Sequence, residues 1–354
     1  MYKGLPVHAA ERHSDCRLSP GGRPLVPIYK KKRVNSLRYV IGIDGGGTKT
    51  EALVLAEDGR EWGGLVVDST NPFAVSFEQA TRNMASLLDK AFSIPELREA
   101  TCEAVCLGLA GVDTDDERAR FRSFVEQYRD ERGLVFETFM NNDAQIALMA
   151  TLGDDRGIIV ISGTGSIAFG LTEDRRKFRV GGWGPLLGDE GSGYDIGVRT
   201  LKAAMRSHDG IEPATLLTES IVRTYGFASV TDLRTYIYQP HLKKHDIAKF
   251  AELCIRADEQ GDDTAGRILD AAAGDLAASA AALVRKDPWF EQCRLVTTGS
   301  IFRHSTRFAD AFRTGLGRLA PNVRVIPSER EPAYGAALLA RRQLRQSQSK
   351  GPSS

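Results

Sequence analysis

The stretch Tyr39-Val-Ile-Gly-Ile-Asp-Gly-Gly-Gly-Thr-Lys-Thr-Glu-Ala-Leu-Val-Leu55 decides the fold, because Gly157-Ile-Ile-Val-Ile-Ser-Gly-Thr-Gly-Ser-Ile-Ala-Phe-Gly-Leu171 repeats its pattern. Each stretch is a β-branched run, a short turn of glycine with threonine or serine, and a second apolar run. Glycine lets the backbone approach a ligand and adopt positive φ, and the hydroxyls are hydrogen-bond donors. Two such hairpins predict a phosphate chain gripped from two sides. A single copy would not decide this, because glycine-rich hairpins also occur in sheets that bind no ligand.

Eight short motifs follow one another from about residue 38 onward. They are Ile43-Asp-Gly-Gly-Gly-Thr48, Ser69-Thr-Asn71, Gly108-Leu-Ala-Gly-Val-Asp113, Asn142-Asp143, Ile161-Ser-Gly-Thr-Gly-Ser166, Gly181-Gly-Trp-Gly184, Leu187-Gly-Asp-Glu-Gly-Ser192 and Thr298-Gly-Ser300. In this order the chain resembles the N-acetylglucosamine kinase group of the actin/hexokinase/Hsp70 superfamily, which shares a domain family with the BadF/BadG ATPases. The resemblance implies an α/β fold with two actin-like ATPase (ribonuclease H-like) domains, whose mixed sheets flank a nucleotide cleft.

Apolar spacing alternates between strand-like and helical from residue 38 onward. Strands are predicted at 38–43, 50–56, 61–67, 103–109, 134–138, 157–161, 166–170, 294–298 and 323–327. We expect a first actin-like domain at 38–140 and a second at 141–330, with a helical elaboration at 194–285. A final helix at 331–345 is expected to pack back on the first domain, with proline in its first turn.

Composition limits the possible partners. At 354 residues the chain is long enough for two domains, and a formal net charge of +1 gives no reason to expect nucleic acid or membrane. No apolar run approaches the ~18 residues of a membrane-spanning helix. The five cysteines form no Cys-x-x-Cys pair, which fits a reducing cytoplasm. Cys102 and Cys106 lie four residues apart in a predicted strand, so we expect both to be core residues on one face.

Residues 1–37 differ from the rest of the chain. They contain the cluster Lys30-Lys31-Lys32-Arg33 and several prolines and glycines, without apolar periodicity. The central apolar stretch of a secretory signal is missing. We interpret this segment as a basic, disordered leader or as sequence upstream of the true start, with a basic targeting arm as the alternative.

Asp44 ends a predicted buried strand, where a carboxylate is unfavourable unless a cation or donors balance it. Mg²⁺, which accompanies phosphates in phosphoryl transfer, would balance it, with Asp143 as a second candidate; a turn-capping role is the alternative for Asp44. Lys49 either neutralises phosphate charge or is simply solvated, and Asn142 either contacts phosphate or caps a helix. The predicted nucleotide-binding residues are Gly45, Gly46, Gly47, Thr48, Lys49, Asn142, Gly163, Thr164, Gly165, Ser166, Gly299 and Ser300.

Asp113 follows an apolar strand, and the family resemblance places the catalytic base there. Its role would be to take the proton from a sugar hydroxyl that attacks the γ-phosphate of ATP. The alternative is an acidic helix N-terminus favoured by the helix dipole, a role that we assign to Asp115, Asp116 and Glu117.

The segment Gly181–Gly193 holds six glycines together with an aromatic and two acidic residues. Ordering such a flexible loop is entropically unfavourable, which indicates a function beyond connection. The resemblance places Gly182, Trp183, Gly184 and Asp189 at an amino sugar, with Asn71 opposite on the first domain. For Trp183 the alternative is an ordinary core aromatic.

The sequence and its resemblance therefore predict an ATP-dependent amino-sugar kinase. The predicted acceptor is a hydroxyl of N-acetylglucosamine, the one at O6. Glucosamine and N-acetylmuramate are alternative acceptors, because Val112 and Asp195 depart from the family pattern. A BadF-type ATPase activator of a reductase is the alternative from another class, but its Fe–S cluster needs cysteine thiolates and Ser162–Gly193 contains none. A transcription regulator would need a helix-turn-helix that the leader does not supply. A homodimer is left open.

Overall fold

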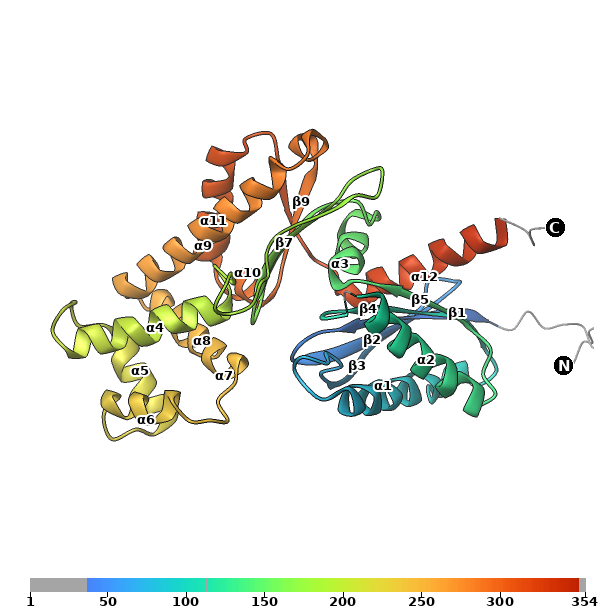
Figure 1. Cartoon of the computed structure of the whole chain (residues 1–354), viewed down its shortest axis with the longest axis horizontal. Helices are drawn as coiled ribbons and strands as arrows, with labels where there is room; N and C mark the ends of the chain where they lie inside the picture. Colours follow the sequence, from blue (N-terminus) through green and yellow to red (C-terminus); the bar gives the residue numbers. More distant parts are fainter. Residues whose placement is uncertain (1–36, 113, 350–354) are drawn as a thin grey trace, which may run out of the picture. The chain divides into compact units, whose positions relative to one another are not determined.

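The computed structural model describes residues 37–112 and 114–349. Two mixed five-stranded sheets with flanking helices make up this part of the chain, so the predicted α/β class is confirmed (Figure 1). The predicted leader lies outside the described residues apart from Leu37, and so does Asp113.

The first sheet contains β1 (Arg38–Gly45), β2 (Lys49–Ala56), β3 (Glu61–Asp68), β4 (Thr101–Leu109) and β5 (Glu137–Asn141), in the spatial order β3-β2-β1-β4-β5. The pairs β1–β2 and β2–β3 are antiparallel, whereas β1–β4 and β4–β5 are parallel. The carboxyl ends of β1, β4 and β5 therefore share one edge, where ligands bind in open α/β sheets. Asp44 lies near the end of β1, and Asn142 directly follows β5.

Helices cover both faces of this sheet. On one face α1 (Phe77–Phe92) and α2 (Asp115–Glu131) pack against β1 and β4, and α1 begins where Ser76 Oγ accepts from the N–H of Gln79 at 3.2 Å. The other face is covered by α3 (Asp143–Leu152) and the C-terminal helix α12 (Pro332–Ser349), as Figure 1 shows. A side chain at Gly42 would collide with the backbone of Ala333, so β1 and α12 meet backbone to backbone.

The second sheet contains β6 (Gly157–Ser162), β7 (Ser166–Leu171), β8 (Lys177–Gly181), β9 (Arg294–Thr298) and β10 (Arg324–Pro327), in the order β10-β9-β6-β7-β8. An antiparallel β6-β7-β8 meander is extended by parallel β9 and β10, so the connectivity matches that of the first sheet. Helices α9 (Asp263–Val284), α10 (Ser300–His304) and α11 (Thr306–Leu319) pack on it. The repeat predicted from the two hairpins is thus a repeat of whole sheets.

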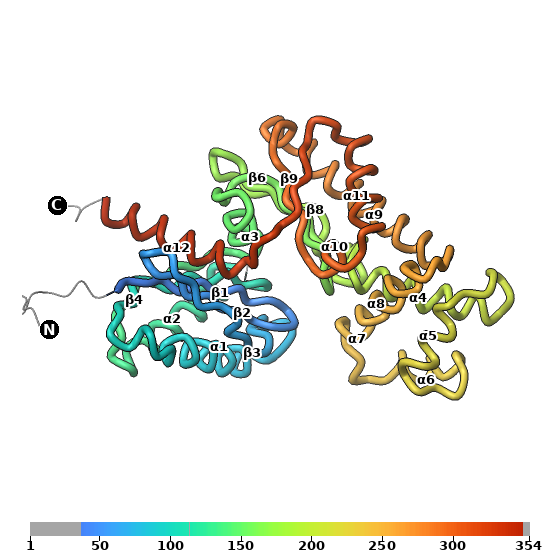
Figure 2. Tube along the Cα trace, turned by 180° about the vertical axis from the view of Figure 1, so that it is seen from behind, coloured from blue at the N-terminus to red at the C-terminus, as the bar shows by residue number. Residues whose placement is uncertain are grey.

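Further helices follow the second meander. They are α4 (Gly193–His208), α5 (Leu216–Tyr225), α6 (Leu233–Ile237), α7 (Lys244–Ala248) and α8 (Phe250–Glu259) (Figure 2). Short 3₁₀ turns lie at Pro95–Leu97, Val230–Asp232 and Pro288–Gln292. The rings of Tyr225 and Phe250 stack with centroids 4.7 Å apart, within a small apolar cluster that joins α4, α5 and α8. No helix in the described ranges is long and apolar enough to span a membrane.

Two strand predictions differ from the structure. Strand β8 was not among the predicted strands, because its sequence Lys-Phe-Arg-Val-Gly is short and alternates charged with apolar residues on a half-buried edge. Strand β5 runs over Glu137–Asn141 rather than 134–138, and boundary shifts of this size are expected for short strands.

The expectation that Cys102 and Cys106 share a face is wrong. Both are buried, but Cys102 packs with the α1 and α2 side of the sheet and Cys106 with the α12 side. The register of β4 against β1 skips Glu103, a β-bulge that reverses the alternation of side chains. Burial raises the pKa of the Cys106 thiol to about 12, as expected for an inert core cysteine.

Candidate active site

The first glycine turn is open to solvent. Gly46 donates its backbone N–H to the carbonyl of Lys49 at 3.0 Å, which closes the turn, and Gly47, Thr48 and Lys49 are exposed. A Cβ at Gly45 would lie 2.5 Å from Thr70 Oγ1, so glycine is required there by lack of space. The sequence suggested two reasons for glycine in this turn, close approach of a ligand and positive φ. None of the three glycines has positive φ, so the second reason does not apply here.

Hydrogen bonds fasten this turn to the segment after β3. Ser69 Oγ donates to the carbonyl of Gly46 at 2.9 Å and accepts from the N–H of Asn71 at 3.1 Å. A Cβ at Gly111 would lie 2.6 Å from Asn71 Oδ1, so the predicted sugar ligand Asn71 lies against the segment that leads to Asp113. These contacts bring one predicted sugar residue to the predicted phosphate turn.

Two carboxylates interact electrostatically at the edge of the first sheet. Burial, and next the charge of Asp143, raise the pKa of Asp44 to about 7. Asp143 is the first residue of α3, and Asn142 caps that helix because its Oδ1 accepts from the N–H of Gln145 at 2.8 Å. The capping alternative therefore holds for Asn142, and its predicted phosphate contact stays a prediction.

A cation would relieve the repulsion between Asp44 and Asp143. Mg²⁺ is usually bound by one or two carboxylates together with waters and substrate phosphates, so this pair fits its preferences. Within residues 37–112 and 114–349 no group of three or more His, Cys, Asp or Glu side chains forms a metal site. A metal held here would therefore take most of its ligands from waters and phosphate oxygens.

The second glycine turn is covered by the chain that precedes α4. Gly163 accepts a backbone hydrogen bond from Gly193 at 2.7 Å, and Thr164 accepts one from Tyr194 at 3.3 Å. Ser166 Oγ donates to the carbonyl of Glu190 at 2.7 Å, and Ser162 Oγ donates to that of Gly191 at 2.6 Å. The predicted phosphate turn and the predicted sugar loop thus form one hydrogen-bonded unit.

Asp189 is the buried centre of this unit. Only 6% of its surface is exposed, Oδ1 accepts from the N–H of Ser166 at 3.3 Å, and Oδ2 lies 2.5 Å from Lys244 Nζ. Lys244 was not predicted from the sequence, because a lysine in a short helix between charged residues carries no distinctive signal. Asp195 was noted only as a departure from the family pattern, and its Oδ2 accepts from the N–H of Gly191 at 2.9 Å.

Trp183 lies on the surface with 59% of its area exposed, so the core-aromatic alternative is excluded. The Arg179 guanidinium lies over the indole, 3.8 Å from its centroid. Gly184 and Gly188 pair in an isolated bridge that makes the segment between them a tight turn. Gly182 has φ of 68°, a conformation that favours glycine, beside the side chain of Ile167.

Gly299 and Ser300 lie next to the second glycine turn. Gly299 has φ of 108°, and a side chain there would collide with the backbone of Ser162. A cavity of about 90 Å³ opens beside it, lined on one side by Thr298, Gly299 and Phe302. The predicted nucleotide-binding residues Gly299 and Ser300 thus lie beside the predicted phosphate turn.

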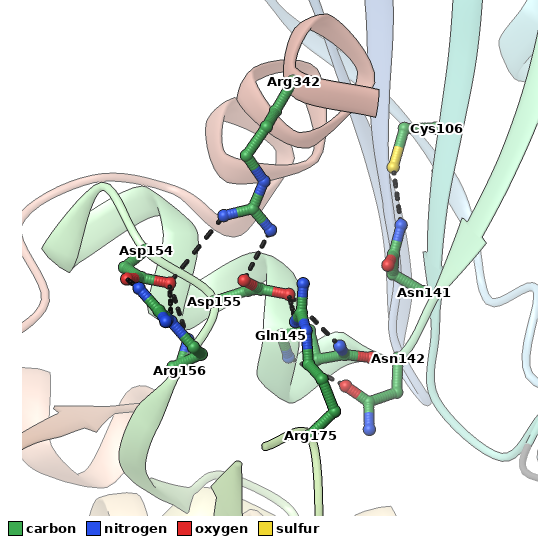
Figure 3. Close-up of polar contacts among 9 residues, drawn as sticks. All are labelled: Cys106, Asn141, Asn142, Gln145, Asp154, Asp155, Arg156, Arg175 and Arg342. Atoms are coloured by element: carbon green, nitrogen blue, oxygen red, sulfur yellow. Dashed lines mark hydrogen bonds and ion pairs between the residues drawn. The ribbon is translucent and has the colours of Figure 1, made fainter. Parts of the chain in front are cut away.

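A charge network around the buried Asp155 was not predicted from the sequence. Figure 3 shows Asp155 between Arg342 of α12 and Arg175, with an N–O distance of 2.5 Å to each. Gln145 Nε2 donates to the same carboxylate at 3.5 Å. This network holds the helix whose first turn carries Asn142 and Asp143. The paired residues lie apart in the sequence, so no local pattern indicates that they meet.

Known proteins similar to this chain include a family of ATPases and two amino-sugar kinases. The sequence profile of the BadF/BadG/BcrA/BcrD ATPase family matches residues 41–340. An N-acetylmuramic acid/N-acetylglucosamine kinase of Clostridium acetobutylicum is 34% identical over 306 residues, covering 86% of this chain and 99% of that protein. An N-acetyl-D-glucosamine kinase of Dictyostelium discoideum is 31% identical over 319 residues, with 86% and 98% covered.

Solved structures agree with the fold. A structure from Chromobacterium violaceum, described as that of a candidate N-acetylglucosamine kinase, aligns with a TM-score of 0.65 and 25% identity. The alignment covers 86% of this chain and 99% of that one.

Proposed function

The chain belongs to the BadF/BadG/BcrA/BcrD ATPase family, and we propose on that basis that it is an ATP-dependent amino-sugar kinase. The acceptor that we propose is N-acetylglucosamine, phosphorylated at O6. The observation that carries the proposal is similarity to two amino-sugar kinases over 86% of this chain and 98–99% of their length. The family profile at residues 41–340 includes both glycine turns. An ATPase family and kinase relatives imply that ATP is the phosphoryl donor.

The reaction joins the acceptor oxygen to the γ-phosphorus of ATP while the bond from that phosphorus to the bridging oxygen breaks, which leaves ADP. We assign the acceptor proton to the Asp113 carboxylate, which would serve as general base. Such assistance contributes ~10²–10⁴-fold, and positioning and charge stabilisation supply most of the remainder. Asp113 follows β4, whose carboxyl end lies at the same edge as Asp44.

The two glycine turns would hold the phosphates. In the first turn Thr48 is exposed and its hydroxyl can donate to a phosphate oxygen, and in the second the backbone of Gly163, Thr164 and Gly165 is partly accessible. Asp44 and Asp143 would hold Mg²⁺, which neutralises phosphate charge when bound. The raised pKa of Asp44 supports this assignment, because a nearby cation would stabilise its ionised form.

The sugar would lie between Asn71 and the loop that carries Gly182, Trp183, Gly184 and Asp189. The exposure of Trp183 supports this placement, since aromatic rings stack on pyranose rings, and Arg179 covers only one face of the indole. N-acetylmuramate is the second candidate acceptor, because the relative from Clostridium acetobutylicum is named for that sugar as well.

An ATPase activator with an Fe–S cluster gains no support from the cysteines that the structure describes. Cys102, Cys106 and Cys254 are buried and all four described cysteines are free. Burial raises the pKa of each of these buried thiols to about 12, which opposes the thiolate form that a cluster needs.

A coupled ADP-release assay tests the proposed function. The acceptors are N-acetylglucosamine, N-acetylmuramate, glucosamine, N-acetylmannosamine and glucose, with 6-deoxy-N-acetylglucosamine as the matched control for O6. We expect the highest kcat/KM with N-acetylglucosamine and no ADP release with the 6-deoxy sugar. Release with the 6-deoxy sugar would contradict O6 as the acceptor atom, and no release with any amino sugar would contradict the function.

A further inference from the structure

Lys244 of α7 reaches the second glycine turn from the helical elaboration. A Cβ at Gly165 would lie 2.7 Å from Lys244 Nζ and 3.1 Å from Asp189 Oδ1. The ammonium and the carboxylate therefore lie directly against the turn that the sequence assigns to phosphate. A side chain at position 165 would displace the ammonium from this position.

Asp189 is buried beside Lys244, and its Oδ2 makes an ion pair but no hydrogen bond. Its Oδ2 lies 2.5 Å from Lys244 Nζ and its Oδ1 accepts from the N–H of Ser166 at 3.3 Å, while only 4% of the side chain is exposed. Because the side chain is almost fully buried, a sugar hydroxyl cannot reach Asp189 in this conformation. If Asp189 binds the acceptor, Lys244 must first move away.

The Lys244 side chain is partly exposed, so its ammonium can reach a second, negatively charged partner. One third of its side chain is exposed, whereas the Asp189 side chain is almost fully buried. The ammonium is a compact charge on a flexible stem, and lysine is a common phosphate ligand. A triphosphate held at Gly165 would bring more than one negative charge within reach of the ammonium.

We propose that Lys244 is a nucleotide-binding residue that pairs with Asp189 in the free protein and transfers to an ATP phosphate when ATP binds, which frees Asp189 for the sugar. This proposal rests on the proposed kinase function. No bond is made or broken in the exchange, since one ion pair replaces another. Thermodynamic linkage then requires that sugar and nucleotide each tighten the binding of the other by the same factor.

Isothermal titration of the full chain tests the exchange. N-acetylglucosamine is titrated with and without Mg²⁺ and the non-hydrolysable analogue AMPPNP, in wild type, Lys244→Met and the control Lys243→Met. Lys243 is the exposed neighbour. In wild type we expect AMPPNP to tighten sugar binding by roughly 5–150-fold, the usual range of coupling between sites.

In Lys244→Met we expect AMPPNP binding to weaken by at least about tenfold and the coupling factor to fall to about one. Lys243→Met should match wild type. A purely structural role for Lys244 would lower the melting temperature and weaken both ligands while the coupling factor stayed unchanged. Unchanged coupling in Lys244→Met, or none in wild type, would therefore overturn the proposal.

Two further variants keep the test decisive if Lys244→Met does not fold. Lys244→Arg retains the charge and should restore most of the coupling. Asp189→Asn removes the competing carboxylate, so AMPPNP should bind at least as tightly as in wild type while sugar binding is lost. Weaker AMPPNP binding in Asp189→Asn would contradict the exchange.

Failure of the proposed kinase function can be distinguished from failure of the Lys244 exchange. Wild type would then release no ADP with any amino sugar, and the sugar half of the proposal would fail with it. The AMPPNP affinity of Lys244→Met, measured without sugar, would still decide whether Lys244 binds nucleotide.

Discussion

The two glycine turns share a sequence pattern but not an environment. The first, between β1 and β2, leaves Gly47 and Thr48 exposed, and Lys49 pairs with Glu51 on its own hairpin at 2.6 Å. The second, between β6 and β7, is covered by the loop before α4 and by Lys244. The position before the turn also differs, since Asp44 in the first hairpin corresponds to Ser162 in the second.

This difference separates what a local pattern determines from what its neighbours determine. The pattern of an apolar run, glycines and a hydroxyl is enough to form a tight hairpin in both sheets. Whether the hairpin is accessible depends on segments inserted after it, which in the second half include α4 and α7. Mutations in the first, open turn are therefore expected to change ligand binding alone. Mutations in the second, covered turn are expected to change both ligand binding and the stability of the fold.

The largest effect is expected on the side of the first hairpin. Asp113→Asn should lower kcat by at least ~10²-fold, because the variant loses the proposed base. The control is Asp115→Asn, in an exposed residue at the start of α2. Steady-state kinetics check this, and a variant that keeps more than a tenth of wild-type kcat would exclude Asp113 as the base.

The two turns should respond differently to a side chain. Gly165→Val should raise KM for both ATP and sugar by about tenfold or more and lower the melting temperature, because it displaces Lys244 and Asp189. Gly47→Val should raise KM for ATP alone, since its Cβ would have no heavy atom closer than Asn71 Nδ2 at 3.9 Å. Equal effects in both variants would remove the distinction between a covered and an open turn.

Asp44 gives the first hairpin a pH dependence that Ser162 cannot give the second. Its pKa is near 4 when unfolded and about 7 when folded, so the folded protein binds the extra proton and stability falls as pH rises from about 4 through 7. Asp44→Asn should therefore stabilise the protein by about 1–2 kcal/mol at pH 8, after allowance for solvent screening, and by nothing at pH 4.

Denaturant unfolding at the two pH values measures this effect. The control is Asp58→Asn, because a hydrogen bond from Arg60 lowers the pKa of Asp58 and the effect of its removal should have the opposite sign. Mg²⁺ with ATP should stabilise wild type but not Asp44→Asn. A stability difference for Asp44→Asn that is equal at pH 4 and pH 8 would rule out a raised pKa.

The smallest effects are expected from the corresponding hydroxyls of the two turns. Ser166→Ala removes the hydrogen bond to the carbonyl of Glu190 and should reduce the free energy of unfolding by about 1 kcal/mol. Thr48→Val removes an exposed hydroxyl and should leave stability unchanged while KM for ATP rises several-fold. Thermal unfolding with steady-state kinetics compares them, and a stability loss in Thr48→Val would show that the first turn is not open.

The sequence predicted the parts of the site that local chemistry determines. Both hairpins, the helix-capping alternative for Asn142 and the exposed aromatic at Trp183 follow from residue types within a few positions of each other. Strand β8 was missed because a short edge strand with alternating charges resembles a loop. The opposite faces of Cys102 and Cys106 follow from a bulge that only the pairing with β1 reveals.

The rest of the site depends on contacts between distant segments. The pairing of Lys244 with Asp189 and of Arg342 with Asp155 joins residues separated by whole helices. Charged residues are common on any surface, so a single sequence does not indicate which of them meet. The nucleotide, sugar and metal roles of the predicted residues stay predictions that the proposed experiments address.

Helix α12 also constrains the order of events on the ribosome. All five strands of the first sheet have been synthesised by Asn141, yet one apolar face of that sheet is covered by residues 332–349. Until that helix is synthesised, Val40, Leu55 and Cys106 lack their final cover, and such exposed surface favours association with other chains. The first sheet is therefore expected to complete its folding only after α12 has been synthesised. A nascent chain released before that point would need a chaperone, because its first half would not fold as a separate domain.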